Sequence, residues 1–297
     1  IVAIVYALIE ANSMGWTNPL IVGLFILGVV LLVAFVWWEK RLADPLMKLE
    51  LFALRNFSVG NVIAFVVAFG MLGIFFPMTL FLQGVLGFSP IRAGMTMIPM
   101  SLMIMVVAPL SGRFSDRIGA RWILTGGLVL ITVGILLIIS SIDTSTTWRS
   151  LLPSLIVTGT GMGMTFAPMT AAAMREVPPR IAGSASGILN TTRNVGQVLG
   201  IAVLGSLLQS WVGIYASDRL DGGALDPAVR ERLIVAIKSS QFELVQQIVP
   251  QEQAALLPQI FHDIQLAFVS GIHNTFLVSA GICALGAVTA LLIRNDV

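Results

Sequence analysis

The residues best suited to chemistry lie in one short charged stretch between two apolar runs. It reads Gly112-Arg113-Phe114-Ser115-Asp116-Arg117-Ile118-Gly119-Ala120-Arg121. A tight turn between helices requires glycine at its ends, which Gly112 and Gly119 supply. The carboxylate of Asp116 is stabilised by backbone donors at the start of the next helix and by Arg113 or Arg117. The stretch therefore predicts either a latch between two helical bundles or an ordinary basic loop.

Polar side chains also interrupt the long apolar runs. Placing a polar group inside a membrane costs free energy, so such residues usually have a function. The candidates for the wall of a substrate cavity are Asn61, Asn190, Arg193, Asn194 and Gln197. Arg193 has a second interpretation, because a long cationic side chain can place its charge among lipid phosphates at the membrane surface.

Methionine is concentrated in two of the apolar runs. Met97 and Met100 lie in the first of these runs, and Met162 and Met164 lie in the second. Methionine is flexible and polarisable, so a methionine-rich wall repacks around apolar ligands of different shapes. The alternative is that these side chains fill gaps between helices. All four are added to the cavity candidates.

The residues that the chain lacks exclude several kinds of chemistry. One cysteine, Cys283, and two histidines leave too little for a disulfide framework or a metal centre, so we expect no cofactor. No HExxH or G-x-S-x-G motif or intramembrane acid pair indicates an enzyme. No Asp or Glu lies inside an apolar run. A proton-coupling carboxylate, if the protein uses one, must therefore lie outside these runs.

The composition identifies the elements that position these residues. The chain has 297 residues, of which 57% are hydrophobic and 11% are charged, with a mean hydropathy of +0.93. A soluble domain carries roughly 25% charged residues. The deficit excludes a cytosolic enzyme, a disordered chain and a nucleic-acid binder, and it indicates an integral membrane protein.

Seven apolar runs are long enough to span a bilayer as helices. They cover residues 20–38, 57–82, 93–110, 122–141, 151–174, 184–213 and 267–293. Residues 1–9 resemble the end of an eighth run. The runs are continuous rather than alternating, which favours helices over the strands of a membrane barrel. Pairs of glycines four residues apart, Gly183 with Gly187 and Gly196 with Gly200, predict close helix packing.

The distribution of Lys and Arg predicts the orientation. One set of connections, including residues 112–121, is rich in arginine, and the alternating short connections hold only Arg92 and Arg149. The arginine-rich set and the C-terminus are therefore expected in the cytoplasm. The long connection 214–266 is expected outside. Within it, Asp226 and Pro227 predict the start of a surface helix that ends before Pro250.

The charged stretch is similar to the signature loop of the major facilitator superfamily, G-x-L-x-D-R-x-G-R-R/K. Gly112, Asp116, Arg117, Gly119 and Arg121 match that pattern. The stretch departs from the pattern in having phenylalanine in place of leucine and alanine in place of the first closing basic residue.

Two further segments resemble one branch of that superfamily, the fourteen-span drug:proton antiporters of the EmrB/QacA type. Trp38-Glu39-Lys40, Asp44-Pro45-Leu46 and residues 51–57 resemble the linker before their C-terminal helices, and residues 183–197 resemble their penultimate helix. The resemblance implies that residues 1–56 hold the end of one span, a linker helix at 20–38 and a cytoplasmic linker. Residues 57–297 would form the all-helical C-terminal six-helix bundle, with the outer loop 214–266.

The resemblance also implies a function. It predicts proton-coupled export of cationic or neutral amphipathic molecules by alternating access in the plasma membrane, the inner membrane of a bacterium. The partners would be the lipid bilayer, a small-molecule substrate, the proton and a missing N-terminal half, with no nucleic acid. Two alternatives remain: export of a metabolite or siderophore, and a non-transporting scaffold that binds a partner through the outer helix.

Overall fold

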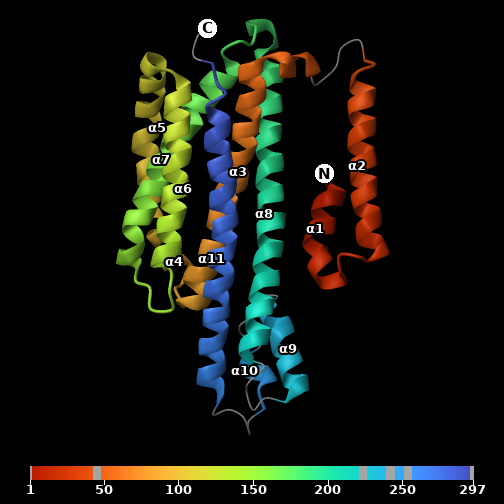
Figure 1. Cartoon of the computed structure of the whole chain (residues 1–297), viewed down its shortest axis with the longest axis vertical. Helices are drawn as coiled ribbons and strands as arrows, with labels where there is room; N and C mark the ends of the chain where they lie inside the picture. The colour runs from red at the N-terminus through yellow and green to blue at the C-terminus, as the bar shows by residue number, and fades with distance from the viewer. Residues whose placement is uncertain (1, 43–47, 221–225, 239–244, 251–255, 295–297) are drawn as a thin grey trace.

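A backbone surrounded by lipid has no water to bond to, so apolar spans satisfy their polar groups within helices. The computed structural model describes residues 2–42, 48–220, 226–238, 245–250 and 256–294, and all regular secondary structure in these ranges is helical. Figure 1 shows long helices packed along one axis, with a separate helical pair beside them.

Within the described ranges, seven helical segments are long and apolar enough to cross a membrane, which confirms the seven predicted spans. They are α2 (Pro19–Glu39), α3 (Arg55–Leu80) with a short π-helix at Phe81–Val85, α4 (Pro90–Thr96) followed by α5 (Ile98–Ile118), α6 (Ala120–Ser141), α7 (Trp148–Met174), α8 (Ala182–Leu220) and α11 (Leu257–Ala290). Short 3-10 helices at Leu49–Ala53 and Pro179–Ile181 precede α3 and α8.

Several helices continue beyond the apolar residues that predicted them. α5 runs to Ile118, so Gly112 lies inside a helix, and the prediction that it begins a tight turn is wrong. Its place is a packing position instead, because a Cβ there would lie 3.7 Å from Ala167 of α7. The predicted loop 214–266 is also too long, since α8 ends at Leu220 and α11 begins at Leu257.

The centre of the bundle is α3, which packs against α7, α8 and α11. Glycine allows the closest of these contacts. A Cβ at Gly196 or Gly200 of α8 would lie 2.6 Å from the carbonyl oxygen of Phe65 or Phe69 of α3. The predicted close packing at this glycine pair is therefore confirmed.

A second group of helices forms around α7, which lies between α5 and α6. The middle of α7 is thinned by glycine, as the backbone contacts require. A Cβ at Gly161 would lie 2.6 Å from the carbonyl oxygen of Gly127, and one at Gly163 would lie 2.8 Å from the Cβ of Val107. The helices on both sides of α7 thus approach its backbone.

The separate pair consists of α1 (Val2–Met14) and α2, which lie side by side in Figure 1. α1 also contacts α8. Nearly every face of α2 is exposed, as expected for a helix surrounded by lipid. Trp16 precedes it, and Trp37 near its other end stacks with Arg41 at 3.6 Å. Tryptophan at both ends is typical of a membrane-spanning helix. Asp44, Pro45 and Leu46 of the predicted linker lie outside the described residues.

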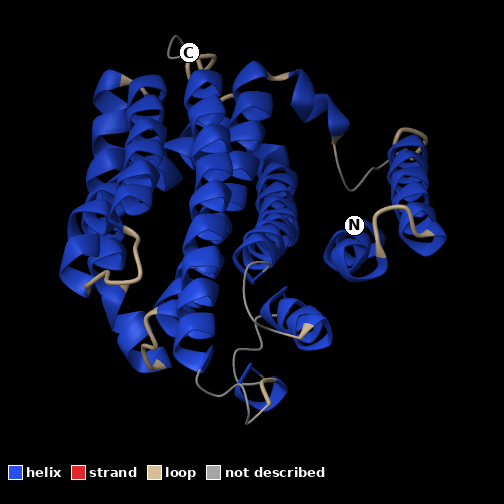
Figure 2. Ribbon diagram, turned by 60° about the horizontal axis from the view of Figure 1, so that its bottom comes forward, coloured by secondary structure: helices blue, strands red, loops and turns tan. Residues whose placement is uncertain are grey.

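The two ends of the bundle differ in the residues that they carry. The arginine-rich end holds the residues Arg55, Arg113, Arg117, Arg121, Arg175, Arg180 and Arg294. The opposite end, brought forward in Figure 2, carries α9 (Pro227–Lys238) and α10 (Val245–Ile248).

The predicted start of the surface helix is confirmed at α9. The side chain of Asp226 accepts a hydrogen bond from the backbone N–H of Ala228 at 2.9 Å. Leu233 and Ile237 are fully buried, so α9 packs on the bundle through its apolar side. Residues 239–244, which fall within the predicted helix, lie outside the described residues.

Candidate functional site

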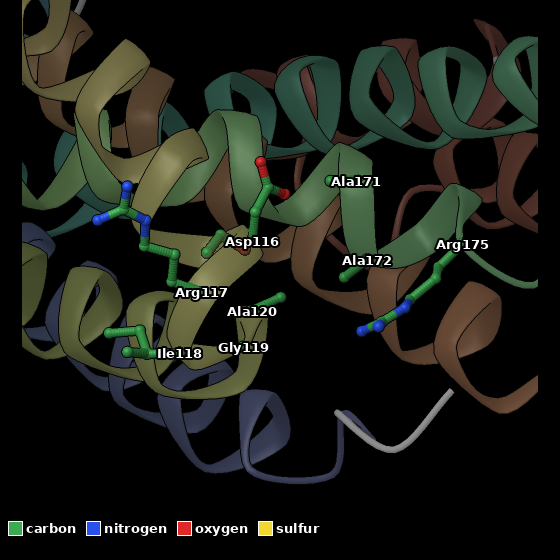
Figure 3. Close-up of a pocket in the computed structure, with 9 residues that line it drawn as sticks. Asp116, Arg117, Ile118, Gly119, Ala120, Ala171, Ala172 and Arg175 are labelled. Carbon is green, nitrogen blue, oxygen red and sulfur yellow. The ribbon is translucent and has the colours of Figure 1, made fainter.

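The charged stretch surrounds a pocket of about 430 Å³ at the arginine-rich end of the bundle (Figure 3). The pocket is lined by the end of α5, the start of α6 and the end of α7. Its lining residues are Ser115, Asp116, Arg117, Ile118, Gly119, Ala120, Ala171, Ala172 and Arg175. The structure therefore brings six residues of the charged stretch, 115–120, together with a third helix.

The sharp turn between α5 and α6 depends on Gly119. Its φ of 89° lies in a region that side chains with a Cβ rarely adopt. This confirms the predicted role of Gly119, and it allows α6 to begin at once with Ala120, which is buried. Arg121 follows, and its guanidinium lies 5.1 Å from the ring centroid of Trp122.

Asp116 is exposed at the end of α5, and its carboxylate and the side chain of Arg117 point in different directions in Figure 3. Within the described ranges, Asp116 forms no hydrogen bond or ion pair with Arg113 or Arg117. Arg175 enters the same pocket from the end of α7. The carboxylate is thus available to a partner outside this bundle, and the latch stays a prediction.

A second feature is a line of small and polar residues on α8, called here the α8 polar stripe. It consists of Gly183, Ser186, Gly187, Asn190, Thr191 and Asn194, all of them exposed. Their spacing of three or four residues places them on one side of the helix. A Cβ at Gly183 or Gly187 would meet nothing within 4 Å, so the predicted close packing of this pair is wrong within the described chain.

Arg193 lies beside the α8 polar stripe and reaches across to α7. Its guanidinium is 5.5 Å from the ring centroid of Phe166, a cation–π contact between the two helices. Arg193 and Gln197 are both half-buried. The structure therefore places Asn190, Arg193, Asn194 and Gln197 together on the same part of α8.

The remaining cavity candidates lie elsewhere, and three of them are wrong. Asn61 is buried between α3 and α8, where its amide donates to the carbonyl of Phe57 and its Oδ1 accepts from Thr192 Oγ1, both at 2.9 Å. Met100 and Met162 are also buried inside the bundle. Each fills space between helices, the alternative that the sequence left open for methionine.

Met97 and Met164 are half-buried. Met97 lies at the break between α4 and α5. The methyl group of Met164 lies 3.5 Å from the place where a Cβ of Gly126 would be, at the contact of α6 with α7. Both residues belong to helices other than α8. That they line a substrate cavity stays a prediction.

Three residues that contribute to these sites were not predicted from the sequence. Phe166, Thr192 and Arg175 each complete a contact or pocket made by a predicted residue. The contacts of Phe166 and Thr192 could not be predicted from the sequence, because the partner of each residue lies on another helix. Arg175 had a usable signal, since it is a basic residue at the predicted end of a span.

Comparison with known proteins agrees with this architecture. A family model described as the Major Facilitator Superfamily matches residues 1–201. The chain is 34% identical to the multidrug resistance protein Stp of Mycobacterium tuberculosis over 80% of its length, which is 44% of that protein. It is 30% identical to the tetracenomycin C resistance and export protein of Streptomyces glaucescens over 98% of its length, or 54% of that protein.

A third relative is the puromycin resistance protein of Streptomyces alboniger, which is 35% identical over 73% of this chain and 44% of its own length. The helical bundle and these matches show that the chain belongs to the Major Facilitator Superfamily and is a multi-pass membrane protein. The chain spans about half the length of the curated relatives that it matches.

Proposed function

We propose that this chain forms the C-terminal half of a proton-driven exporter of small toxic molecules, of the fourteen-span EmrB/QacA type. The α8 polar stripe carries the proposal. Polar groups within a span are costly in lipid, so an exposed line of them indicates a surface that faces water or another helical bundle. Membership in the superfamily supports a second bundle as that partner. The names of the relatives, which refer to multidrug and antibiotic resistance, support the substrate class.

The proposed mechanism is alternating access, in which two bundles rock about a central site. In this chain the wall of that site would be the α8 polar stripe with Arg193 and Gln197. The arginine-rich end would face the cytoplasm, and Asp116 would bind the other bundle when that end is closed. The carboxylate that couples transport to protons would belong to the N-terminal half.

The test is export by the transporter that contains this chain together with its N-terminal half. Cells that produce it should survive higher puromycin concentrations and remove a fluorescent dye, rhodamine 123, faster than cells with an empty vector. An uncoupler that collapses the proton gradient should abolish the difference. Equal survival and equal dye retention, with the protein inserted in the membrane, would contradict the proposal.

A further inference from the structure

The charge at Arg193 is unusually deep in the bundle. Among the described helices, it is the only Asp, Glu, Lys or Arg that lies more than ten residues from both ends of its helix. At a rise of about 1.5 Å per residue, it is roughly 16 Å from the start of α8. A cation at such a depth is costly unless it has a partner, so its environment indicates what that partner is.

The side chain does not reach the nearer end of the helix. Its guanidinium lies over Phe166, which is eight residues before the end of α7 at the same end of the bundle. That distance corresponds to roughly 12 Å of helix. The alternative in which Arg193 places its charge among lipid phosphates therefore does not describe this conformation.

The contacts of Arg193 leave its hydrogen-bonding capacity unused. In the described part of the chain, its guanidinium forms the contact with the Phe166 ring and neither a hydrogen bond nor an ion pair. A guanidinium has five N–H donors in a rigid planar fork, which fits the two oxygens of a carboxylate. The contact with the Phe166 ring does not use those donors.

Two amides add further donors beside the charge. Asn190 is three residues before Arg193 and Gln197 is four residues after it, so the three side chains share one side of α8. Asn190 is exposed and Gln197 is half-buried. Nearby donors of this kind hold a bound anion in one orientation.

We propose that Arg193, held by Phe166 and flanked by Asn190 and Gln197, binds a carboxylate or similar planar anionic group. The source is a small organic substrate, so the transported class includes organic anions as well as the cationic or neutral molecules that the family resemblance implies. This proposal rests on the proposed function, since it places the anion in the export pathway. The other source of the same chemistry is a carboxylate side chain on the N-terminal half.

Two dyes with the same xanthene ring system distinguish these sources: fluorescein, an anion, and rhodamine 123, a cation. Efflux of each would be measured from proteoliposomes that contain the transporter with both halves. Arg193→Gln should lower fluorescein efflux at least tenfold more than rhodamine efflux, the change expected from losing a charge-assisted hydrogen bond. Arg193→Lys should retain an intermediate rate, because it keeps the charge and loses the fork. Arg180→Gln removes an exposed arginine outside α8 and should match the unmodified protein.

Fluorescein binding separates this proposal from the proposed function. The detergent-purified transporter should bind fluorescein, measured by fluorescence polarisation, and Arg193→Gln should weaken binding at least tenfold. Binding that depends on Arg193 without export of either dye would support the anion site and contradict the export function. Equal loss of efflux for both dyes in Arg193→Gln would overturn the proposal, because it indicates an ion pair with the N-terminal half. Unchanged fluorescein binding in that variant would overturn it as well.

Discussion

At the scale of single residues, the hydrogen bond between Asn61 and Thr192 joins the two helices at the centre of the bundle. The hydroxyl of Thr192 on α8 donates to Asn61 Oδ1 on α3. Asn61 is 3% exposed, so water does not replace this donor when it is lost. An amide oxygen left without a donor in an apolar interior costs free energy, which makes this pair a structural contact.

Thr192→Val keeps the shape of the side chain and removes that donor. We expect the free energy of unfolding to fall by about 1 kcal/mol, near the value measured for hydrogen bonds between membrane helices. The matched control is Thr191→Val, because the Thr191 hydroxyl bonds only to the carbonyl of Gly187 in its own helix. Thermal unfolding of the purified proteins in detergent measures both. Equal melting temperatures for the two variants would refute the role of the pair.

Asp116 offers a prediction for the pocket at the arginine-rich end. Asp116→Asn preserves the size of the side chain and removes its charge, so we expect dye efflux to fall roughly tenfold, the effect of losing one charge-assisted contact. Membrane insertion should be unchanged because Asp116 is exposed and packs against nothing in the core. The control is Asp143→Asn, an exposed acid in the connection between α6 and α7. Efflux that is unaffected by Asp116→Asn would rule out the latch.

The sequence identified the polar residues correctly but not the direction in which each one faces. Asn61 and Asn194 both interrupt apolar runs, and only the packing shows that the first is buried and the second exposed. Whether a residue is buried depends on which helix packs against it. When a helix is apolar on all sides, its sequence does not indicate which face contacts another helix. The structure contradicts the cavity prediction for Asn61, Met100 and Met162, which are buried, and for the residues of α8 the cavity stays a prediction.

At the scale of elements, the contact between α3 and α8 consists of backbone against backbone. Gly196 and Gly200 let the carbonyl groups of Phe65 and Phe69 approach α8 more closely than any side chain would allow. On the other side of the same helix, Gly187 faces open space. α8 therefore has one side that fixes it to this bundle and another that is free to contact something else.

Alanine substitutions test this division of α8. Gly200→Ala places a methyl group against a backbone oxygen that cannot move aside, and we expect a loss of about 1–3 kcal/mol in stability. Gly187→Ala should leave stability unchanged, because a Cβ there meets nothing within 4 Å. The melting temperatures of the two purified variants provide the comparison. The assignment of sides would fail if Gly187→Ala were the more damaging change.

The sequence located the spans but placed the ends of α5 and α8 too early and the start of α11 too late. Hydropathy reports how far a helix lies within lipid, and a helix continues into water wherever its backbone bonds remain intact. α5 continues through Arg113 and Asp116 for this reason. α8 likewise extends to α9, which packs against it and buries Leu233 and Ile237. The sequence therefore predicts a loop for the charged stretch, most of which is helical in the structure.

At the scale of the whole molecule, the bundle is asymmetric in what it exposes. α3 is largely buried, whereas α8 presents polar residues along the side away from α3. Other exposed surfaces, such as that of Leu285 and Val288 on α11, are apolar. An apolar face is stable against lipid, whereas a polar face at membrane depth requires water or a polar partner. The proposed function therefore requires the α8 polar stripe to face the water-filled pathway of the transporter.

Labelling by a membrane-impermeant, water-soluble maleimide tests that requirement most directly. The variant Asn194→Cys would be compared with Leu285→Cys on α11, where Leu285 is 68% exposed. Both variants would be made in the transporter with both halves, in membrane fragments that the reagent reaches from both sides. The native Cys283 is 1% exposed and gives a low background. We expect rapid labelling of Asn194→Cys, slowed by an exported substrate, and little labelling of Leu285→Cys. Labelling of both at the same low rate would contradict the proposed function.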